Sequence, residues 1–279
     1  MTVARVLAIA LLASACNEVF DLDPTTLASP TSIPKTCTPI GETPAWSPRL
    51  SPVLVRDCTS FMIEAGVVTA SCLTPAPNNT YAHDAVEGSL DAVDALVPIP
   101  GIPSETGPPN QRQVRRSPDG ARLYVPDPYR MRIALYRRGT AAWELAGNLP
   151  MVMMLATELS TIASDGARDR LIIMNYMTAI ELEGDGGTTW TELGRFTPAA
   201  LGLPPQFGFS AFAMTPDGLR ALVVTDRVYY TDRPTLDDPF RAGELIADLP
   251  PTASLYMTAD CSRAYVADLG VVFYAERRE

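Results

Sequence analysis

Hydrophobic positions in this chain fall into short runs separated by turn residues. Residues 210–250 show the pattern best, with apolar runs at 210–214, 221–225, 227–231 and 243–250. Asp-Gly and other turn residues lie between the runs, as is typical of hairpins that join short strands. Several of the runs are continuously apolar, which is expected of strands covered on both faces. Four strands in about 45 residues is the size of one propeller blade, so the pattern predicts an all-β fold.

A short unit recurs along the body of the chain. Three copies are SPDGARLYV at 117–125, SDGARDRLI at 164–172 and TPDGLRALV at 215–223. TADCSRAYV at 258–266 is a fourth copy with Cys in place of Gly, and VRDCTSFMI at 55–63 is a weaker fifth. In such turns the Asp side chain bonds nearby backbone and Gly accepts a positive φ, so we assign these residues a structural role. The repeat-turn residues are Asp57, Asp119, Gly120, Asp165, Gly166, Asp217, Gly218 and Asp260.

The repeats predict a β-propeller of five four-stranded blades that is closed by an N-terminal strand. The last unit ends after its third run, at 271–275, whereas a strand is left over near residues 43–50. We expect that strand, which contains Trp46, to complete the last blade and so remove an exposed sheet edge. The alternative is that Trp46 is an isolated surface anchor. Trp143 and Trp190 are expected in the fourth strands of their own units.

The Ser/Thr-Pro-Asp-Gly-x-x-Leu-x-Val unit resembles the repeat of TolB-type, WD-like bacterial β-propellers, over residues from about 40 to the end. The resemblance implies a propeller, and many exported members of that group are binding or scaffold proteins. It carries over no catalytic residue, because the repeated Asp and Gly are structural.

The start of the chain has the three parts of a secretory signal. Arg5 supplies a positive charge, residues 6–12 are apolar but too few to span a bilayer, and small residues at 13–15 precede Cys16. LASAC at 12–16 resembles the bacterial lipobox, which implies that Cys16 is diacylated on sulfur and becomes the mature N-terminus. Ala13 departs from the Leu preferred there, and residues 13–15 also fit a plain signal peptide. Asn17, in place of the Asp that favours inner-membrane retention, favours the outer membrane.

We therefore expect three segments: a signal peptide at 1–15, a lipidated N-terminus with a flexible linker at 16–39, and a propeller domain at 40–279. The linker has many breakers and no sustained period. The net charge is −10, with both signs interspersed, which argues against a nucleic-acid partner because such partners require a basic face. We expect an exported monomer that is held to the membrane by its lipid, with an envelope protein or a glycan as candidate partner.

Four cysteines remain after Cys16, and an even number outside the cytosol suggests two disulfides. A hairpin turn centred on residue 65 pairs residues whose numbers sum to 130, which places Cys58 opposite Cys72. Cys37 precedes the strand assigned to the last blade and Cys261 lies in the turn of that blade, so they form the second expected pair. Four free thiols, or a bridge from Cys58 to Cys261, are the alternatives.

Candidate chemistry is sparse. His83 is the single histidine and is expected in a solvated loop; it excludes a two-His metal motif, and a Ser-His-Asp triad would depend on it alone. EGDGG at 183–187 lacks the spaced carboxylates of a calcium loop, and no nucleotide-binding motif occurs. We expect no metal and no cofactor. The sequence favours a non-catalytic binding or scaffold module that binds at one end of the central channel. The alternative is a glycan-active enzyme with carboxylates at the channel mouth.

Overall fold

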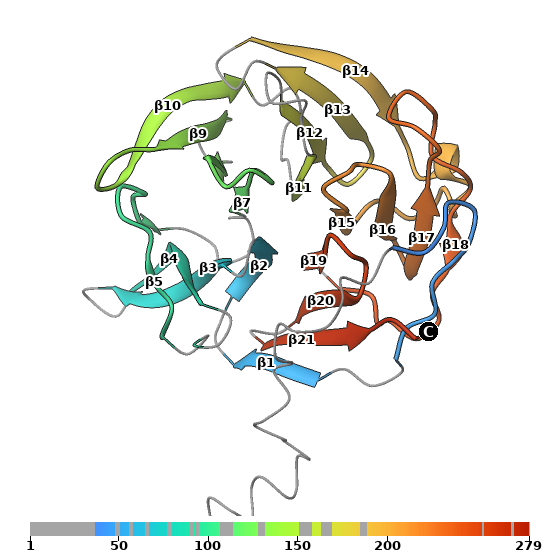
Figure 1. The fold of residues 1–279 in the computed structure, drawn as a ribbon, viewed down its shortest axis with the longest axis horizontal. Coiled ribbons are helices and arrows are strands. Elements are labelled where there is room, and N and C mark those ends of the chain that lie inside the picture. Colours follow the sequence, from blue (N-terminus) through green and yellow to red (C-terminus); the bar gives the residue numbers. More distant parts are fainter. Residues whose placement is uncertain are drawn as a thin grey trace, which may run out of the picture. The chain divides into compact units, whose positions relative to one another are not determined.

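Five small antiparallel sheets stand in a ring (Figure 1), and each is one blade of a five-bladed β-propeller. The computed structural model describes residues 37–47, 51–55, 58–64, 67–76, 80–89, 92, 95–106, 114–127, 132–150, 158–162, 169–184, 189–252, 254–268 and 271–278. The expected signal peptide and most of the expected linker, including Cys16, lie outside these residues. In the part of the chain that is described, helix is limited to short 3₁₀ turns such as Ala199–Leu201, and no helix is long and apolar enough to cross a membrane.

The blades follow one another along the chain. Blade 1 contains β2 (Cys58–Glu64), β3 (Val67–Ala76), β4 (Thr80–Ser89), β5 (Val97–Pro98) and β6 (Glu105–Thr106). Blade 2 contains β7 (Arg115–Arg116), β8 (Arg122–Asp127), β9 (Arg132–Arg138) and β10 (Trp143–Pro150). Blade 3 contains β11 (Glu158–Ile162), β12 (Asp169–Met174), β13 (Ala179–Gly184) and β14 (Trp190–Phe196). Blade 4 contains β15 (Ala211–Met214), β16 (Arg220–Val224), β17 (Val228–Asp232) and β18 (Glu244–Leu245). Blade 5 contains β19 (Ser254–Met257), β20 (Arg263–Asp268), β21 (Val271–Glu276) and β1 (Ser51–Val55).

The predicted fold class, blade number and closure are confirmed. β2, β7, β11, β15 and β19 lie innermost, and β1 joins the outer edge of blade 5 beside β21 (Figure 1). The closing strand lies a few residues later than the predicted 43–50, with Ser51 paired to Tyr274. Trp46 forms only an isolated bridge with Arg277, but its side chain is fully buried in the cluster between blades 4 and 5. The surface-anchor alternative for Trp46 is therefore wrong.

The hydrophobic core lies between blades. Five buried clusters are present among the described residues, and each joins two neighbouring blades around the ring. Leu135 of blade 2 and Ile173 of blade 3, for example, share one cluster. Because both faces of each sheet are covered in this way, the middle strands are apolar at successive positions, as the sequence predicts.

Three repeat turns share one geometry. Asp119, Asp217 and Asp260 each accept a hydrogen bond from the backbone N–H two residues later, at 3.0 Å in all three. Each also accepts one from the Ser or Thr hydroxyl two residues earlier. Gly120 and Gly218 both have φ +71°, and Cys261 occupies the same position with φ +55°. These turns connect the first and second strands of blades 2, 4 and 5; the copy with Asp165 and Gly166 lies outside the described residues.

The weaker fifth copy, at 55–63, does not contain the turn between the first and second strands of a blade. Its residues 58–63 belong to β2, which is the innermost strand of blade 1 and pairs with β3. The reason is the closure itself, because the strand that precedes this copy belongs to the last blade. Asp57 itself lies outside the described residues.

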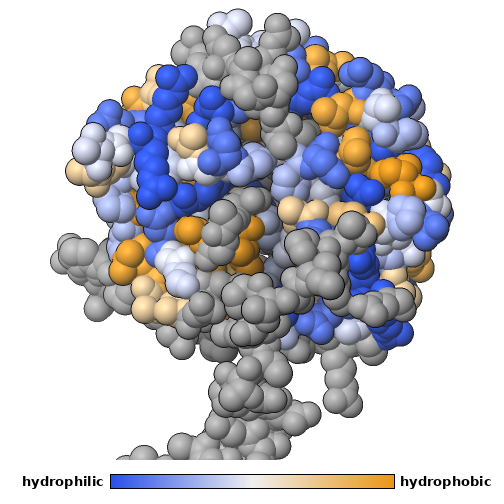
Figure 2. All heavy atoms as spheres, viewed as in Figure 1, coloured by the Kyte–Doolittle hydropathy of each residue, from blue (hydrophilic) through white to orange (hydrophobic). Residues whose placement is uncertain are grey.

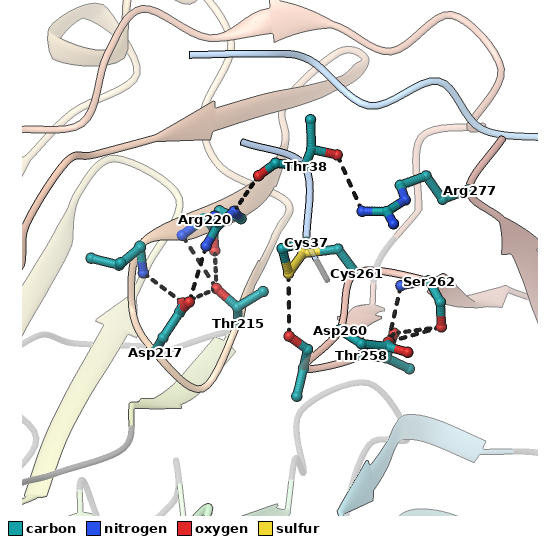
Figure 3. Close-up of a disulfide and its surroundings, with 12 residues drawn as sticks. Cys37, Thr38, Thr215, Asp217, Arg220, Thr258, Asp260, Cys261, Ser262 and Arg277 are labelled. Carbon is teal, nitrogen blue, oxygen red and sulfur yellow. Dashed lines mark hydrogen bonds and ion pairs between the residues drawn. A yellow bond between two sulfur atoms is a disulfide. The ribbon is translucent and has the colours of Figure 1, made fainter. Parts of the chain in front are cut away.

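Residues 37–47 form an N-terminal strap that is fastened to blades 4 and 5 (Figure 3). Cys37 is disulfide-bonded to Cys261, with an S–S distance of 2.03 Å. Arg220 Nε donates to the carbonyl of Thr38 at 2.9 Å, and Arg277 Nη1 donates to the Thr38 hydroxyl at 3.3 Å. Gly41 N–H donates to the Asp232 carboxylate of blade 4 at 2.9 Å.

The second disulfide joins Cys58 and Cys72 across β2 and β3, with an S–S distance of 2.06 Å. Both disulfides join the cysteines that the sequence predicts. The crossed pairing of Cys58 with Cys261 and the free-thiol alternative are both wrong.

Candidate functional site

The innermost strands do not bring two carboxylates together. β7, β15 and β19 contain no acidic residue. Glu64 is the last residue of β2 and Glu158 is the first residue of β11. The innermost strands of a propeller run in the same direction along its axis, so these two residues belong to opposite ends of the ring. The described inner strands therefore lack the arrangement that the glycan-active alternative requires.

Buried charged side chains fasten neighbouring blades to one another. Arg116 of blade 2 pairs with Glu87 of blade 1, and Arg122 of blade 2 pairs with Asp169 of blade 3 at 2.6 Å. The Tyr124 hydroxyl also donates to Asp169. Burial raises the pKa of the Asp169 carboxyl, against the opposing effect of that hydrogen bond and of the guanidinium. Such pairs account for buried carboxylates without any catalytic role, because a buried charge requires a partner.

A third pair lies between blades 3 and 4. Arg233, which directly follows β17, donates from Nη1 and Nη2 to the two carboxylate oxygens of Glu181 in β13, at 2.9 and 3.0 Å. Both side chains are almost completely buried. The Arg233 guanidinium also lies over the Phe240 ring, 4.5 Å from its centroid. This bidentate arrangement fixes both groups and leaves Glu181 unsuited to proton transfer.

A cavity of about 470 Å³ opens above this pair, between β14 of blade 3 and the β17–β18 loop of blade 4. Its volume is in the range of small-molecule sites, about 300–1,000 Å³. Blade 3 and the segment that follows it contribute Arg170, Glu181, Leu193, Gly194, Arg195, Phe196, Ala200 and Leu201. Blade 4 contributes Arg233, Leu236, Asp237, Asp238, Pro239 and Phe240.

A bulge and a glycine keep this space open. Glu181 is paired with Gly194 and Leu182 with Glu192, so Leu193 is the extra residue of β14. A Cβ built on Gly194 would meet no atom within 4 Å. Leu193 is 45% exposed. Bulges often occur where a strand edge is shaped for binding, and here the missing side chain leaves the hollow above Glu181.

The polar groups of the cavity have unused hydrogen-bonding capacity. Arg170 Nε donates to Glu183 at 3.0 Å, whereas its Nη1 is 3.6 Å from Glu181 and its Nη2 is 3.8 Å from Asp237. These last two distances exceed hydrogen-bond length. The buried Nη1 of Arg170 has no hydrogen-bond partner, and the Asp237 side chain is 93% exposed.

Apolar side chains complete the site. Phe196 of β14 and Phe240 of the β17–β18 loop pack with ring centroids 5.8 Å apart. Leu193 and Leu201 line the cavity from the blade 3 side, and Leu236 lines it from blade 4. The arrangement can hold a small ligand between apolar walls and hydrogen-bonding groups. Of the lining carboxylates, Glu181 accepts from Arg233, Asp238 accepts from the Thr235 hydroxyl, and Asp237 is exposed.

The expected site residues are only partly within the described chain. Asp57, Asp165, Gly166 and Cys16 lie outside it. His83 lies in β4, paired with Leu73 of β3 and Glu105 of β6, so its assignment to a loop is wrong. The described residues contain no group of three or more His, Cys, Asp or Glu side chains placed to hold a metal ion.

The sequence did not predict the cavity, although the bulge beside it has a sequence signal. Trp143 and Trp190 begin the outer strands β10 and β14, and each is followed four residues later by a glycine, Gly147 and Gly194. In both strands the register shifts just before that glycine. The Trp-x-x-x-Gly pattern therefore marks a bulged outer strand.

Comparison with known proteins gives no family. No family model matches the chain, and no curated protein matches it. Solved structures with a similar fold include a functionally unknown protein from Desulfotomaculum acetoxidans (12% identity, TM-score 0.47, covering 76% of this chain and 66% of that one). A second is the periplasmic gluconolactonase PpgL of Pseudomonas aeruginosa (16% identity, TM-score 0.45, covering 77% of this chain and 64% of that one). A third is the β-propeller domain of Cps50 (Swd1) from Myceliophteria thermophila (9% identity, TM-score 0.44, covering 78% of this chain and 83% of that one). This chain thus spans about two thirds of the length of the Desulfotomaculum protein and of PpgL. Such distant likenesses carry no information on its activity.

Proposed function

We propose that this chain is an exported lipoprotein, lipidated at Cys16 and held at the cell envelope, whose TolB-type propeller acts as a binding module. The signal-like start of the sequence supports export, and two disulfides are typical of proteins outside the cytosol. Asn17 after the cysteine favours the outer membrane. The ligand site in this proposal is the cavity between blades 3 and 4.

One observation carries the choice of binding over catalysis. The cavity has room for a ligand, but its buried carboxylate, Glu181, is held by both terminal nitrogens of Arg233. A general acid or base needs a carboxyl group that is free to exchange a proton with the substrate. The groups with spare capacity, Arg170 and Asp237, are suited to hydrogen bonding. Within the described inner strands, the two acidic residues, Glu64 and Glu158, belong to opposite ends of the ring, so these strands offer no carboxylate pair to the glycan-active alternative.

A cavity-filling variant tests the binding site. Gly194→Leu places a side chain in the cavity, where a Cβ meets no atom within 4 Å, so the fold should tolerate it. Gly194→Ala is the matched control, because it adds a single methyl group at the same position. Immobilised wild-type protein and both variants would be incubated with small-molecule and glycan fractions of an envelope extract, and bound components would be identified by mass spectrometry.

We expect a component that the wild type and Gly194→Ala retain unchanged and that Gly194→Leu loses. Retention by all three proteins would contradict the cavity as the site. Conversion of the component to a new product by the wild type would contradict a non-catalytic role. Thermal unfolding of the three proteins provides the check that each is folded.

The lipid anchor is tested separately at Cys16. Intact-mass analysis of the mature protein should show a diacylated N-terminal Cys16, and the protein should partition into detergent. Cys16→Ser should leave the precursor unprocessed at this site. An unmodified N-terminus at residue 16 or 17 would refute lipidation and leave the binding module unaffected.

A further inference from the structure

We infer that the cavity between blades 3 and 4 binds a neutral saccharide unit, a ring with several hydroxyl groups and an apolar face. The inference rests on the proposed function, because it takes this cavity as the ligand site and names the class of ligand. It is carried by the charge balance, the hydrogen-bonding groups and the apolar walls of the cavity.

The lining groups are balanced in charge. The lining residues include three arginines, Arg170, Arg195 and Arg233, and three acidic residues, Glu181, Asp237 and Asp238. A ligand with a net charge would therefore meet groups of its own sign and of the opposite sign together, and would gain little from Coulomb attraction. A neutral ligand that both donates and accepts hydrogen bonds can use groups of both signs.

The polar groups also match hydroxyls in kind. A hydroxyl group donates one hydrogen bond and accepts others, whereas a guanidinium only donates and an ionised carboxylate only accepts. Arg170 Nη2 lies 3.8 Å from the Asp237 carboxylate, beyond hydrogen-bond length, and the Asp237 side chain is exposed. Neighbouring hydroxyls on a ring can accept a hydrogen bond from the guanidinium and donate one to the carboxylate. Hydrogen bonds to charged groups are stronger than those between neutral ones, so these contacts favour a hydroxyl-rich ligand.

Apolar walls from both blades suit the C–H face of such a ring. Leu193 is held toward solvent by the bulge, and Leu236 and Pro239 line the cavity from the loop of blade 4. On the face drawn in Figure 2, hydrophobic residues lie among hydrophilic ones.

Isothermal titration of the full chain with defined probes tests the inference. The probes are the methyl glycosides of glucose, galactose, mannose and N-acetylglucosamine, together with their homodisaccharides. Phenylacetate serves as an anionic probe and phenethylamine as a cationic one. We expect saturable binding of at least one neutral glycoside or disaccharide and no binding of the two charged probes.

Variants then locate the binding. Gly194→Leu should abolish it and Gly194→Ala should preserve it, while Arg170→Met should weaken it about tenfold through the lost charge-assisted hydrogen bonds. Leu193→Ser should weaken it, and Leu145→Ser should not, because Leu145 is a similarly exposed leucine of β10 outside the cavity.

Binding that survives in Gly194→Leu would overturn the inference, as would the failure of every neutral saccharide to bind. Cavity-dependent binding of a charged probe alone would also overturn it. In that last case the cavity remains the proposed binding site and only the ligand class is wrong. The same holds if the envelope fractions yield a non-saccharide component that the wild type binds and Gly194→Leu does not.

Discussion

Cys261 is a cysteine at a position where the fold favours glycine. Its φ is +55°, and the equivalent residues of blades 2 and 4 are Gly120 and Gly218 at +71°. A left-handed backbone costs a residue with a Cβ roughly 1–2 kcal/mol. The bridge to Cys37 spans 224 residues of sequence. On the chain-entropy model a loop of that length stabilises the fold by about 5 kcal/mol, which exceeds the backbone cost.

Two double variants isolate the backbone term. Cys37→Ala with Cys261→Gly and Cys37→Ala with Cys261→Ala both lack the disulfide, and they differ only at residue 261. Glycine avoids the left-handed cost but makes the unfolded chain more flexible, a penalty of about 0.4–1 kcal/mol. We therefore expect the glycine variant to be more stable by about 0.5–1 kcal/mol, with both variants less stable than the wild type by about 2–5 kcal/mol.

Urea-induced unfolding, followed by tryptophan fluorescence without reductant, measures these differences while Cys58–Cys72 stays intact. Gly218→Ala in the wild type is the matched control, because it adds a Cβ to the same turn position in blade 4 and should lose a similar amount. If the two double variants have the same free energy of unfolding, the left-handed conformation at residue 261 carries no net cost for a residue with a Cβ, and the prediction is wrong.

Three further perturbations have defined outcomes. Burial would raise the pKa of the Asp260 carboxyl, but hydrogen bonds from Thr258 and Ser262 outweigh burial and hold this pKa below its ordinary value of 3.8. Ionised Asp260 therefore stabilises the fold above pH 3.8. Asp260→Asn should lower the melting temperature at pH 7, and the gap from wild type should shrink as the pH falls below about 4; a constant gap would count against this sign. Trp46→Ala should cost about 3–5 kcal/mol in urea unfolding, and an unchanged midpoint would show that the buried indole contributes little. Glu181→Ala should cost about 3–5 kcal/mol by leaving Arg233 buried without its partner, and replacement of both residues by Met should cost less; the reverse order would contradict this account of the pair.

Much of the ring was predictable because a blade is a local structure. In blade 4 the predicted runs at 210–214, 221–225 and 227–231 differ from β15, β16 and β17 by about one residue at each end. The fourth run, 243–250, is reduced to the two residues of β18. Both residues of β18 are exposed, so the apolar pattern of this run does not define how much of it pairs.

Bulges explain where the sequence reasoning fell short. The predicted pairing of Cys58 with Cys72 is right, but Phe61 pairs with Ala70, so most of this hairpin has a register one residue away from the predicted one. A shift between Cys58 and Ser60 restores the predicted pair at the disulfide. The cavity depends on the same kind of feature at Leu193. A bulge is defined by the pairing of two strands, so the hydrophobic pattern of one strand does not show where the bulge falls.

The bridge at Cys37 also decides how the ring bears mechanical load. A pull on the chain ahead of residue 37 passes through the sulfur atoms to the turn between β19 and β20. Without the bridge, the same pull would load the two hydrogen bonds of Thr38 first. It would next load the hydrogen bonds of Gly41, Ala45 and Ser47, and only then the β1–β21 seam, one pair at a time from Ser51. Because the covalent link lies ahead of that seam, tension bypasses the strap, and the hydrogen bonds that close the ring carry none of it.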